Sequence, residues 1–396
     1  MSKFAMHSSP FTQLFDSLHE QATDRTGLTD FGDSYYQQNL KFLLQAYDAT
    51  AQLSEAGRRV VEKTLLDCLS SRLLAVAGWK RNPQCLQRDI ESPIFVIGLP
   101  RTGTTALHKL LAADPDCQYL EYWLATSPMT RPPRQQWRDN PCYMQAEKNL
   151  QELYSRADGL KSVHDMTAET ADECRFLLMQ DFVGMTFPCN ASIGAYESWI
   201  PNQDLIPAYR HHRDNLCLIG ADDHPKRWVL KNPGHLFALD ALLAVYPDCK
   251  IVQTHRDPSV LIPSVSSLVY RVRSVNEPSV SKADVVRQML KQWAASLDKC
   301  MEARKSIDSA QVVDVYYDDF VADAVGTAQG IYSHFDLTMP EHTRSSLMAW
   351  HQDNQQGKYG RHDYSAQEYG LSAGEIRETF AQYIRQFSVP LYPDVR

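Results

Sequence analysis

PIFVIGLPRTGTTALHKLL, residues 93–111, is the stretch that decides the fold of this chain. The apolar run at 94–97 is typical of a strand buried on both faces in a parallel sheet. Leucines recur at helical spacing in the second half of the stretch, which predicts a helix from Thr104 onward. We therefore expect a strand and a helix joined by a short loop between Gly98 and Gly103.

The loop from Gly98 to Thr105 has the composition of a phosphate cradle. Backbone N–H groups at the start of a helix, together with the helix dipole, attract anions. Gly103 allows the backbone to approach an anion closely, and the hydroxyls of Thr104 and Thr105 add hydrogen-bond donors. The alternative interpretation is an ordinary glycine turn before a helix.

The loop departs from the pattern of nucleotide triphosphatases. That pattern reads G-x-x-x-x-G-K-[ST], and here Thr104 stands at the position of the lysine. The cation of the loop, Arg101, comes earlier in the chain. A magnesium-binding carboxylate would be expected directly after the later strand at 250–254, but Arg256 of His-Arg-Asp-Pro occupies that position. We therefore expect the loop to bind phosphate without a metal ion.

Outward from the loop, strands and helices alternate. Further strands are expected at 117–120, 228–231, 250–254 and 311–316, with helices between them at 236–246, 259–270 and 283–305. This alternation predicts an α/β sandwich around a parallel sheet.

A second candidate phosphate site follows the strand at 250–254. Arg256 lies at the C-terminal end of that strand, the edge at which open α/β sheets bind ligands. Ser264 follows at a spacing of about two helical turns, so the two side chains can grip one phosphate from two sides. The alternative is that Arg256 pairs with Asp257 or another carboxylate.

The composition is ordinary for a globular enzyme, with 43% hydrophobic and 22% charged residues. The net charge of −8 and the lack of a long basic run argue against a nucleic-acid partner. Nine scattered cysteines without a CxxC pair argue against a zinc site or a disulfide framework. Without an apolar signal segment or a run of roughly 18 apolar residues, we expect a cytoplasmic protein with no membrane span.

With both phosphate motifs in this order, the chain resembles the superfamily of sulfotransferases that use 3′-phosphoadenosine 5′-phosphosulfate (PAPS), and within it the bacterial branch with arginine in the loop. The resemblance rests on PIFVIGLPRTGTTALHKLLAADP, RWVLKNPGHLFALDALLAVYPDCKIVQTHRDPSVLIPSVSSL, VDVYYDDFVAD and GKYGRHDYSAQEYGLS. It implies a P-loop-like three-layer sandwich with a central parallel sheet. It also implies sulfuryl transfer from PAPS to a hydroxyl or amine of a small molecule, with release of 3′-phosphoadenosine 5′-phosphate (PAP) and no metal.

The resemblance implies donor contacts residue by residue. The 5′-phosphosulfate would be held by Arg101, Thr102, Gly103, Thr104 and Thr105, and the 3′-phosphate by Arg256 and Ser264. Tyr317 would lie near the adenine. A late basic segment would also contact the 3′-phosphate, through Lys358, Gly360 and Arg361. Many family members stack a tryptophan on the adenine directly after the loop threonines, and Ala106 replaces it here.

On this interpretation, the chain is divided into three regions. Residues 1–92 are expected to form an N-terminal helical extension that packs on the core or covers a pocket. Residues 93–396 are expected to form the sulfotransferase domain, in which about 121–225 is a helical acceptor-binding insertion. The total of 396 residues exceeds the ~250–300 at which a single core stops growing.

Sulfuryl transfer needs a deprotonated acceptor, a sulfur held in line and a neutralised leaving oxygen. Arg101 is the candidate for the leaving group. Lys231, at the end of a predicted strand, is the candidate for the bridging or sulfuryl oxygens. The alternative for Lys231 is a surface lysine at a strand end.

The general base is left open among four residues. Glu121 follows a predicted strand, at about the place where some family members use a glutamate. His235 comes shortly after Lys231, as a catalytic histidine does in other members at a shorter spacing. His164 and Glu173, within the insertion, are a third option. The adjacent pair His211-His212 is expected at the surface.

Two other functions stay open on the sequence alone. A kinase-like enzyme on the same scaffold would need a cation at Thr104 and a magnesium carboxylate. A non-catalytic nucleotide-binding protein would keep the phosphate motifs without an activated base. The partner is a small-molecule acceptor, and the aromatic residues of the insertion favour an apolar or aromatic alcohol, although core packing explains them equally well. The oligomeric state is not decided.

Overall fold

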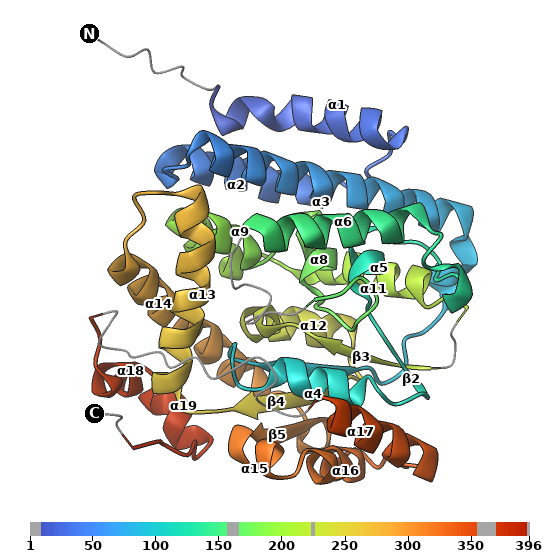
Figure 1. Cartoon of the computed structure of the whole chain (residues 1–396), viewed down its shortest axis with the longest axis vertical. Coiled ribbons are helices and arrows are strands. Elements are labelled where there is room, and N and C mark those ends of the chain that lie inside the picture. The colour runs from blue at the N-terminus through green and yellow to red at the C-terminus, as the bar shows by residue number, and fades with distance from the viewer. Residues whose placement is uncertain (1–8, 157–165, 223–225, 355–369, 394–396) are drawn as a thin grey trace.

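The centre of the molecule is a five-stranded parallel sheet (Figure 1) with the order β2-β3-β1-β4-β5. The computed structural model describes residues 9–156, 166–222, 226–354 and 370–393. The strands are β1 (Ile94–Gly98), β2 (Cys117–Tyr119), β3 (Arg227–Lys231), β4 (Lys250–His255) and β5 (Val312–Tyr316). Each agrees with its predicted range to within a residue at either end, so the central parallel sheet is confirmed.

Helices cover both faces of this sheet. Ile94 and Val96 of β1 belong to one hydrophobic cluster, and Phe95 and Ile97 belong to another, because neighbouring side chains of a strand point to opposite faces. The first cluster is covered by α4 (Thr104–Leu111), α16 (Ala324–His334) and α17 (Glu341–Asp353). The second is covered by α12 (Leu239–Val245), α13 (Pro258–Asn276) and α14 (Lys282–Arg304). This is the predicted three-layer sandwich.

The N-terminal region is helical over its described residues. It consists of α1 (Phe15–Thr26), α2 (Tyr35–Thr50) and α3 (Glu55–Arg81). Ser54 caps α3, since its side chain accepts a hydrogen bond from the N–H of Gly57 at 3.0 Å. Buried leucines of α2 and α3 belong to the same hydrophobic cluster as one face of the sheet. Figure 1 shows these helices stacked on the side of the molecule remote from β5.

The segment between β2 and β3 is also helical. Its helices are α5 (Tyr122–Thr126), α6 (Pro141–Arg156), α8 (Arg175–Leu178), α9 (Thr186–Asn190), α10 (Gly194–Trp199) and α11 (Ile206–Ile219). After β3, the 3-10 helix η6 (Pro233–Ala238) leads into α12. The chain continues after β5 with α15 (Tyr317–Ala322) and ends with α18 (Ala373–Thr379) and α19 (Ala381–Gln386). Within the described ranges, no helix combines the length and the apolar character of a membrane span.

The surface position predicted for His211 and His212 is wrong. Both side chains on α11 are buried. His211 Nε2 lies 2.7 Å from Gln180 Oε1, and His212 Nδ1 lies 2.8 Å from the Tyr246 hydroxyl. Gln180 and Tyr246 come from distant parts of the chain and satisfy one nitrogen of each buried ring.

Candidate active site

The loop between β1 and α4 is shaped by residues with positive φ. Arg101 has a φ of 74° and Gly103, the N-cap of α4, a φ of 88°. A Cβ placed on Gly98 would lie 2.3 Å from Thr254 Oγ1 and 2.8 Å from Thr254 O, so β4 leaves no room for a side chain there. A loop of this kind turns its backbone N–H groups toward one concavity, next to the positive end of α4.

Thr102 fixes the loop to the sheet. Its buried Oγ1 donates a hydrogen bond to Leu99 O at 2.6 Å and lies 2.5 Å from Thr254 Oγ1. Its backbone N–H also bonds to Leu99 O, at 3.3 Å. The Thr102 hydroxyl thus serves the shape of the loop, whereas Thr104 and Thr105 stand at the start of α4.

Arg256 reaches this loop from the end of β4. Its Nη1 donates a hydrogen bond to Arg101 O at 3.2 Å, and its guanidinium lies 3.7 Å from the centre of the Tyr317 ring. The Tyr392 ring lies 5.7 Å from the same guanidinium. Arg256 Nε is buried and finds no hydrogen-bond acceptor among the described residues. Arg256 therefore has donor capacity that these residues do not use.

Asp257 has partners other than its neighbour Arg256. Its carboxylate accepts hydrogen bonds from Arg377 Nη2 at 2.7 Å, Tyr392 N at 3.0 Å and Ser259 N at 2.9 Å. Burial alone would raise the pKa of Asp257, but the hydrogen bonds from these three groups lower it below its usual value. The carboxylate caps α13 and leaves Arg256 directed at the loop and Tyr317.

Gly103, Arg256 and Tyr317 are brought together by the fold. A Cβ on Gly103 would lie 3.2 Å from Tyr317 Cδ2, so the aromatic ring packs directly against the loop. Ser264 lies on α13, the helix that follows Arg256, and is partly exposed. The loop and the end of β4 thus form one continuous surface.

Lys231 joins a carboxylate to the first turn of α4. Its Nζ lies 2.5 Å from Glu173 Oε1 and 3.3 Å from Thr105 Oγ1, and the side chain is only 2% exposed. Glu173 Oε2 lies 3.1 Å from Arg175 Nε. A hydrogen bond from Cys174 N to Lys231 O, at 2.9 Å, holds this segment against the end of β3. The interpretation of Lys231 as a surface lysine is wrong, because it is buried.

Glu121 is held in a buried ion pair. Its Oε2 accepts hydrogen bonds from Arg131 Nη2 at 3.0 Å and from Arg131 Nε at 3.3 Å. The same arginine donates to Tyr119 O at 2.7 Å and to Gln118 Oε1 at 3.1 Å. Glu121 therefore anchors the end of β2 in the structure.

His235 lies in the buried core on η6. Its Nδ1 is 2.7 Å from the Tyr209 hydroxyl, and its ring is fully buried. Nε2 finds no hydrogen-bond partner among the described residues. Burial, and secondarily the nearby His212, holds the pKa of His235 well below its usual value, so the ring is neutral. Glu173 lies close enough to interact electrostatically with His235, but the hydrogen bond of the His235 ring among the described residues is to Tyr209.

The remaining candidates lie outside the described residues. These are His164, Lys358, Gly360 and Arg361. Four side chains that hold the site in shape were not singled out from the sequence, namely Arg131, Arg175, Arg377 and Tyr392. Each acts through a partner distant in sequence or through an irregular segment, and no local pattern marks such partners.

The arrangement brings two sets of residues together at the start of α4. The glycine loop and Arg256 lie side by side, linked by the hydrogen bond to Arg101 O. Beside them, a buried cation and a carboxylate meet at the start of α4. Among the described residues, His, Cys, Asp and Glu side chains form no group of three that would hold a metal ion.

Comparison with known proteins supplies the context for this geometry. Residues 93–341 match the model of the sulfotransferase family. The crystal structure of sulfotransferase STF1 from Mycobacterium tuberculosis H37Rv matches with a TM-score of 0.85 and 40% identity, over 93% of this chain and 98% of that one. Sulfotransferase STF9 from Mycobacterium avium shares the fold, with a TM-score of 0.85 and 24% identity over 98% of this chain and 99% of that one.

A curated relative extends the comparison. Omega-hydroxy-beta-dihydromenaquinone-9 sulfotransferase Stf3 of Mycobacterium tuberculosis is 24% identical over 263 residues, or 62% of this chain. The Stf3 of Mycobacterium bovis matches to the same extent. The chain spans 63% of the length of these two relatives.

Proposed function

The chain belongs to the sulfotransferase family, and on that premise we propose that it transfers the sulfuryl group of PAPS to a hydroxyl or amine of a small-molecule acceptor and releases PAP. The hydrogen bond of 3.2 Å between Arg256 Nη1 and Arg101 O carries this proposal. It places a second cation directly beside the loop, as the binding of one ligand with two phosphate groups requires. The nine cysteines are all free thiols, which supports a reducing compartment, and we propose the cytoplasm.

The residues of the site fit such a donor. Thr254 leaves no room for a side chain at Gly98, and the Tyr317 ring packs against Gly103. Because both positions lack a side chain, the loop backbone can close around a phosphate. Arg256 has unused donor capacity among the described residues and lies over Tyr317. We assign the 5′-phosphosulfate to the loop, the 3′-phosphate to Arg256 and Ser264, and the adenine to the neighbourhood of Tyr317. Arg361 stays a further proposed contact to the 3′-phosphate.

The reaction requires one bond to break and one to form. The bond between sulfur and the bridging oxygen breaks, and that oxygen leaves on PAP with the electron pair. The acceptor oxygen or nitrogen forms the new bond to sulfur and gives its proton to a base. Arg101 and Lys231 offset the negative charge that grows on the bridging and sulfuryl oxygens.

We propose Glu173 as the base. It contacts Lys231, which in turn contacts Thr105 of the phosphate loop, whereas Glu121 is bound to Arg131 and His235 lies in the core. In the free protein Lys231 neutralises Glu173. When sulfuryl oxygens draw Lys231 toward the loop, Glu173 loses this neighbouring cation, and its affinity for the acceptor proton rises.

The first prediction concerns the nucleotide. PAP should raise the melting temperature in the absence of magnesium, because a ligand that binds only the folded protein stabilises it by mass action, by about 2.7 kcal/mol at a hundred times its Kd. A thermal-shift series with PAP, ATP and ATP–magnesium tests this. Stabilisation by ATP–magnesium alone would favour a kinase-like enzyme and overturn the proposal.

The second prediction concerns the 3′-phosphate. Arg256→Ala should weaken PAP by roughly 10- to 150-fold and adenosine 5′-phosphate far less, because it removes a charge-assisted contact to the phosphate that only PAP carries. Ser264→Ala should lose less. Titration calorimetry with both nucleotides measures the difference, and Arg271→Ala, an exposed position on α13, is the matched control. Equal losses for both nucleotides would show that Arg256 serves the fold.

A further inference from the structure

A cleft of about 820 Å³ lies between the end of α2, the segment around α10, η6, α13 and α14. Its floor is buried and consists of Met185, Phe237, Arg273, Glu277, Gln292 and Ser296. Its rim is exposed and includes Asp284, Arg287, Lys291, Ala295 and Lys299 of α14. The cleft therefore has an entrance along α14 and a closed inner end.

Two polar atoms on the floor lack hydrogen bonds. Arg273 is 1% exposed; its Nε donates to Pro188 O at 2.7 Å and its Nη1 to Gln288 Oε1 at 2.5 Å. Its Nη2 lies 3.6 Å from Glu197 Oε1 but makes no hydrogen bond among the described residues, and the same holds for Gln292 Oε1. Buried polar atoms are rarely left in this state, because the loss of water without replacement is unfavourable. One donor and one acceptor of the lining residues are thus unsatisfied, and both atoms are covered by neighbouring side chains.

The charges around these atoms favour a neutral ligand. The charge of Arg273 is already opposed by Glu197. Glu277 accepts hydrogen bonds from Gln52 N at 3.0 Å and from Ser192 N and Oγ at 2.9 and 2.7 Å. At the floor an anion would face both carboxylates, since the cations Arg287, Lys291 and Lys299 lie at the rim, whereas a hydroxyl or an amide can accept from Arg273 and donate to Gln292 without adding charge.

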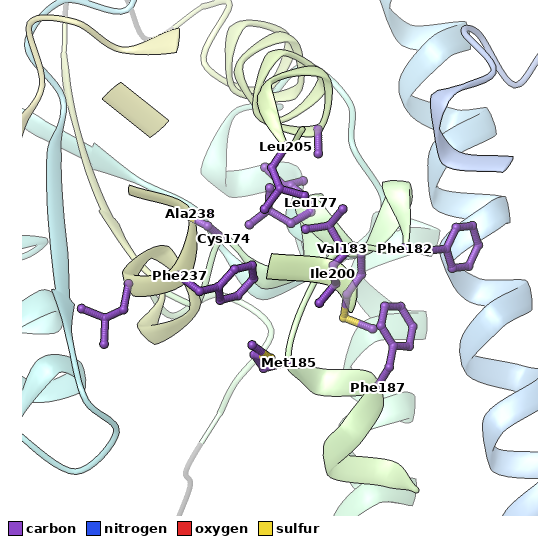
Figure 2. Packing of buried hydrophobic residues seen from close by; sticks show 14 of the residues in the cluster. Cys174, Leu177, Phe182, Val183, Met185, Phe187, Ile200, Leu205, Phe237 and Ala238 are labelled. Carbon is purple, nitrogen blue, oxygen red and sulfur yellow. The ribbon is translucent and has the colours of Figure 1, made fainter. Parts of the chain in front are cut away.

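Lys231 and Glu173 do not line the cleft, but three elements that form it lead along the chain toward these residues. Phe237 follows Lys231 by six residues on η6, and the chain path between them allows a separation of at most roughly 15 Å. Met185 lies on the segment that begins with Glu173. Helix α13 carries Ser264 near its start and Arg273 near its end. Figure 2 shows Met185 and Phe237 at the edge of the apolar packing around Cys174.

We propose that this cleft is the acceptor-binding site, resting on the proposed sulfuryl transfer, and that it takes an elongated alcohol with an apolar body and a second neutral polar group. The hydroxyl that accepts the sulfuryl group lies toward Lys231 and Glu173. The apolar body packs on Met185 and Phe237. A distal hydroxyl or amide is held by Arg273 and Gln292, within roughly 15 Å of the reacting end.

The proposal is tested with α,ω-alkanediols of increasing chain length and the matching 1-alkanols, with PAPS as donor and mass detection of the sulfated product. The KM for diols should fall as the chain reaches the distal subsite and should lie about three- to tenfold below that of the matching alkanol. Gln292→Met, which removes the amide and keeps the length of the side chain, should abolish this difference. Ala295→Trp, at the exposed rim, should raise the KM for all long probes at least about tenfold by blocking the entrance.

The controls separate this inference from the proposed function. Asp298→Trp, an exposed position of α14 that does not line the cleft, should leave KM unchanged, and PAP affinity should be the same in all variants. If the wild type and Ala295→Trp sulfate the probes with equal KM, the cleft is not the acceptor site, and the proposal of sulfuryl transfer is unaffected. Loss of PAP binding in the wild type would instead overturn the proposed function. For a probe that is not sulfated, calorimetry measures its binding to the PAP-bound protein. If none of the diols binds, the assignment of the cleft as the acceptor site is wrong.

Discussion

Replacing Glu173 by glutamine is expected to lower turnover by roughly 10²–10⁴-fold while the affinity for PAP is unchanged. Glutamine keeps the shape and can still accept a hydrogen bond from Lys231, but it cannot take a proton from the acceptor. The contact of 2.5 Å between Glu173 Oε1 and Lys231 Nζ places this carboxylate beside the phosphate loop. The measurement is kcat with an acceptor found by screening a library with PAPS, together with the Kd of PAP.

The matched control is Glu169→Gln. This residue lies four positions earlier on the same segment and pairs with the exposed Arg134 at 3.3 Å, so the same change of charge is made away from Lys231. Its turnover should stay close to that of the wild type. If Glu173→Gln keeps turnover within about tenfold of the wild type, the base must be sought among Glu121, His235 and His164.

The sheet could be predicted from the sequence because its signal is local. Four apolar residues before Gly98 are typical of a strand buried on both faces, and β1 does occupy the centre of the parallel sheet. The loop and Arg256 were predicted for the same reason, since the end of a strand fixes where the next residues lie. Their contact through Arg101 O required only that β1 and β4 be neighbours.

The partners of the catalytic candidates could not be predicted, because they depend on the path of an irregular segment. Glu173 meets Lys231 only because Cys174 bonds to the end of β3, and no periodicity encodes that bond. His211 and His212 were misplaced for a related reason. Polar residues on the inner face of α11 look like a solvent-exposed stripe until Gln180 and Tyr246 are brought to them by tertiary packing.

Replacing Arg131 by methionine is expected to destabilise the protein by about 3–5 kcal/mol, because it removes the guanidinium that opposes the charge of the buried Glu121 carboxylate. The side chains of Arg131 and Glu121 are 8% and 4% exposed. The arginine also donates to Tyr119 O and Gln118 Oε1, so its loss frees three acceptors at the end of β2. Unfolding in urea, followed by circular dichroism, measures the change in the free energy of unfolding.

A second substitution at Glu121 distinguishes a structural ion pair from a catalytic base. Adding Glu121→Gln to Arg131→Met removes the buried charge and should recover part of the lost stability, since a neutral side chain is less unfavourable in this position. The control Arg134→Met breaks an ion pair whose arginine is 69% exposed, and it should cost at most about 1 kcal/mol. Glu121→Gln alone should lower stability while the turnover of the folded protein changes little. A loss of turnover by two orders of magnitude or more with stability retained would instead make Glu121 the base, and Arg131 would then be the residue that orients it.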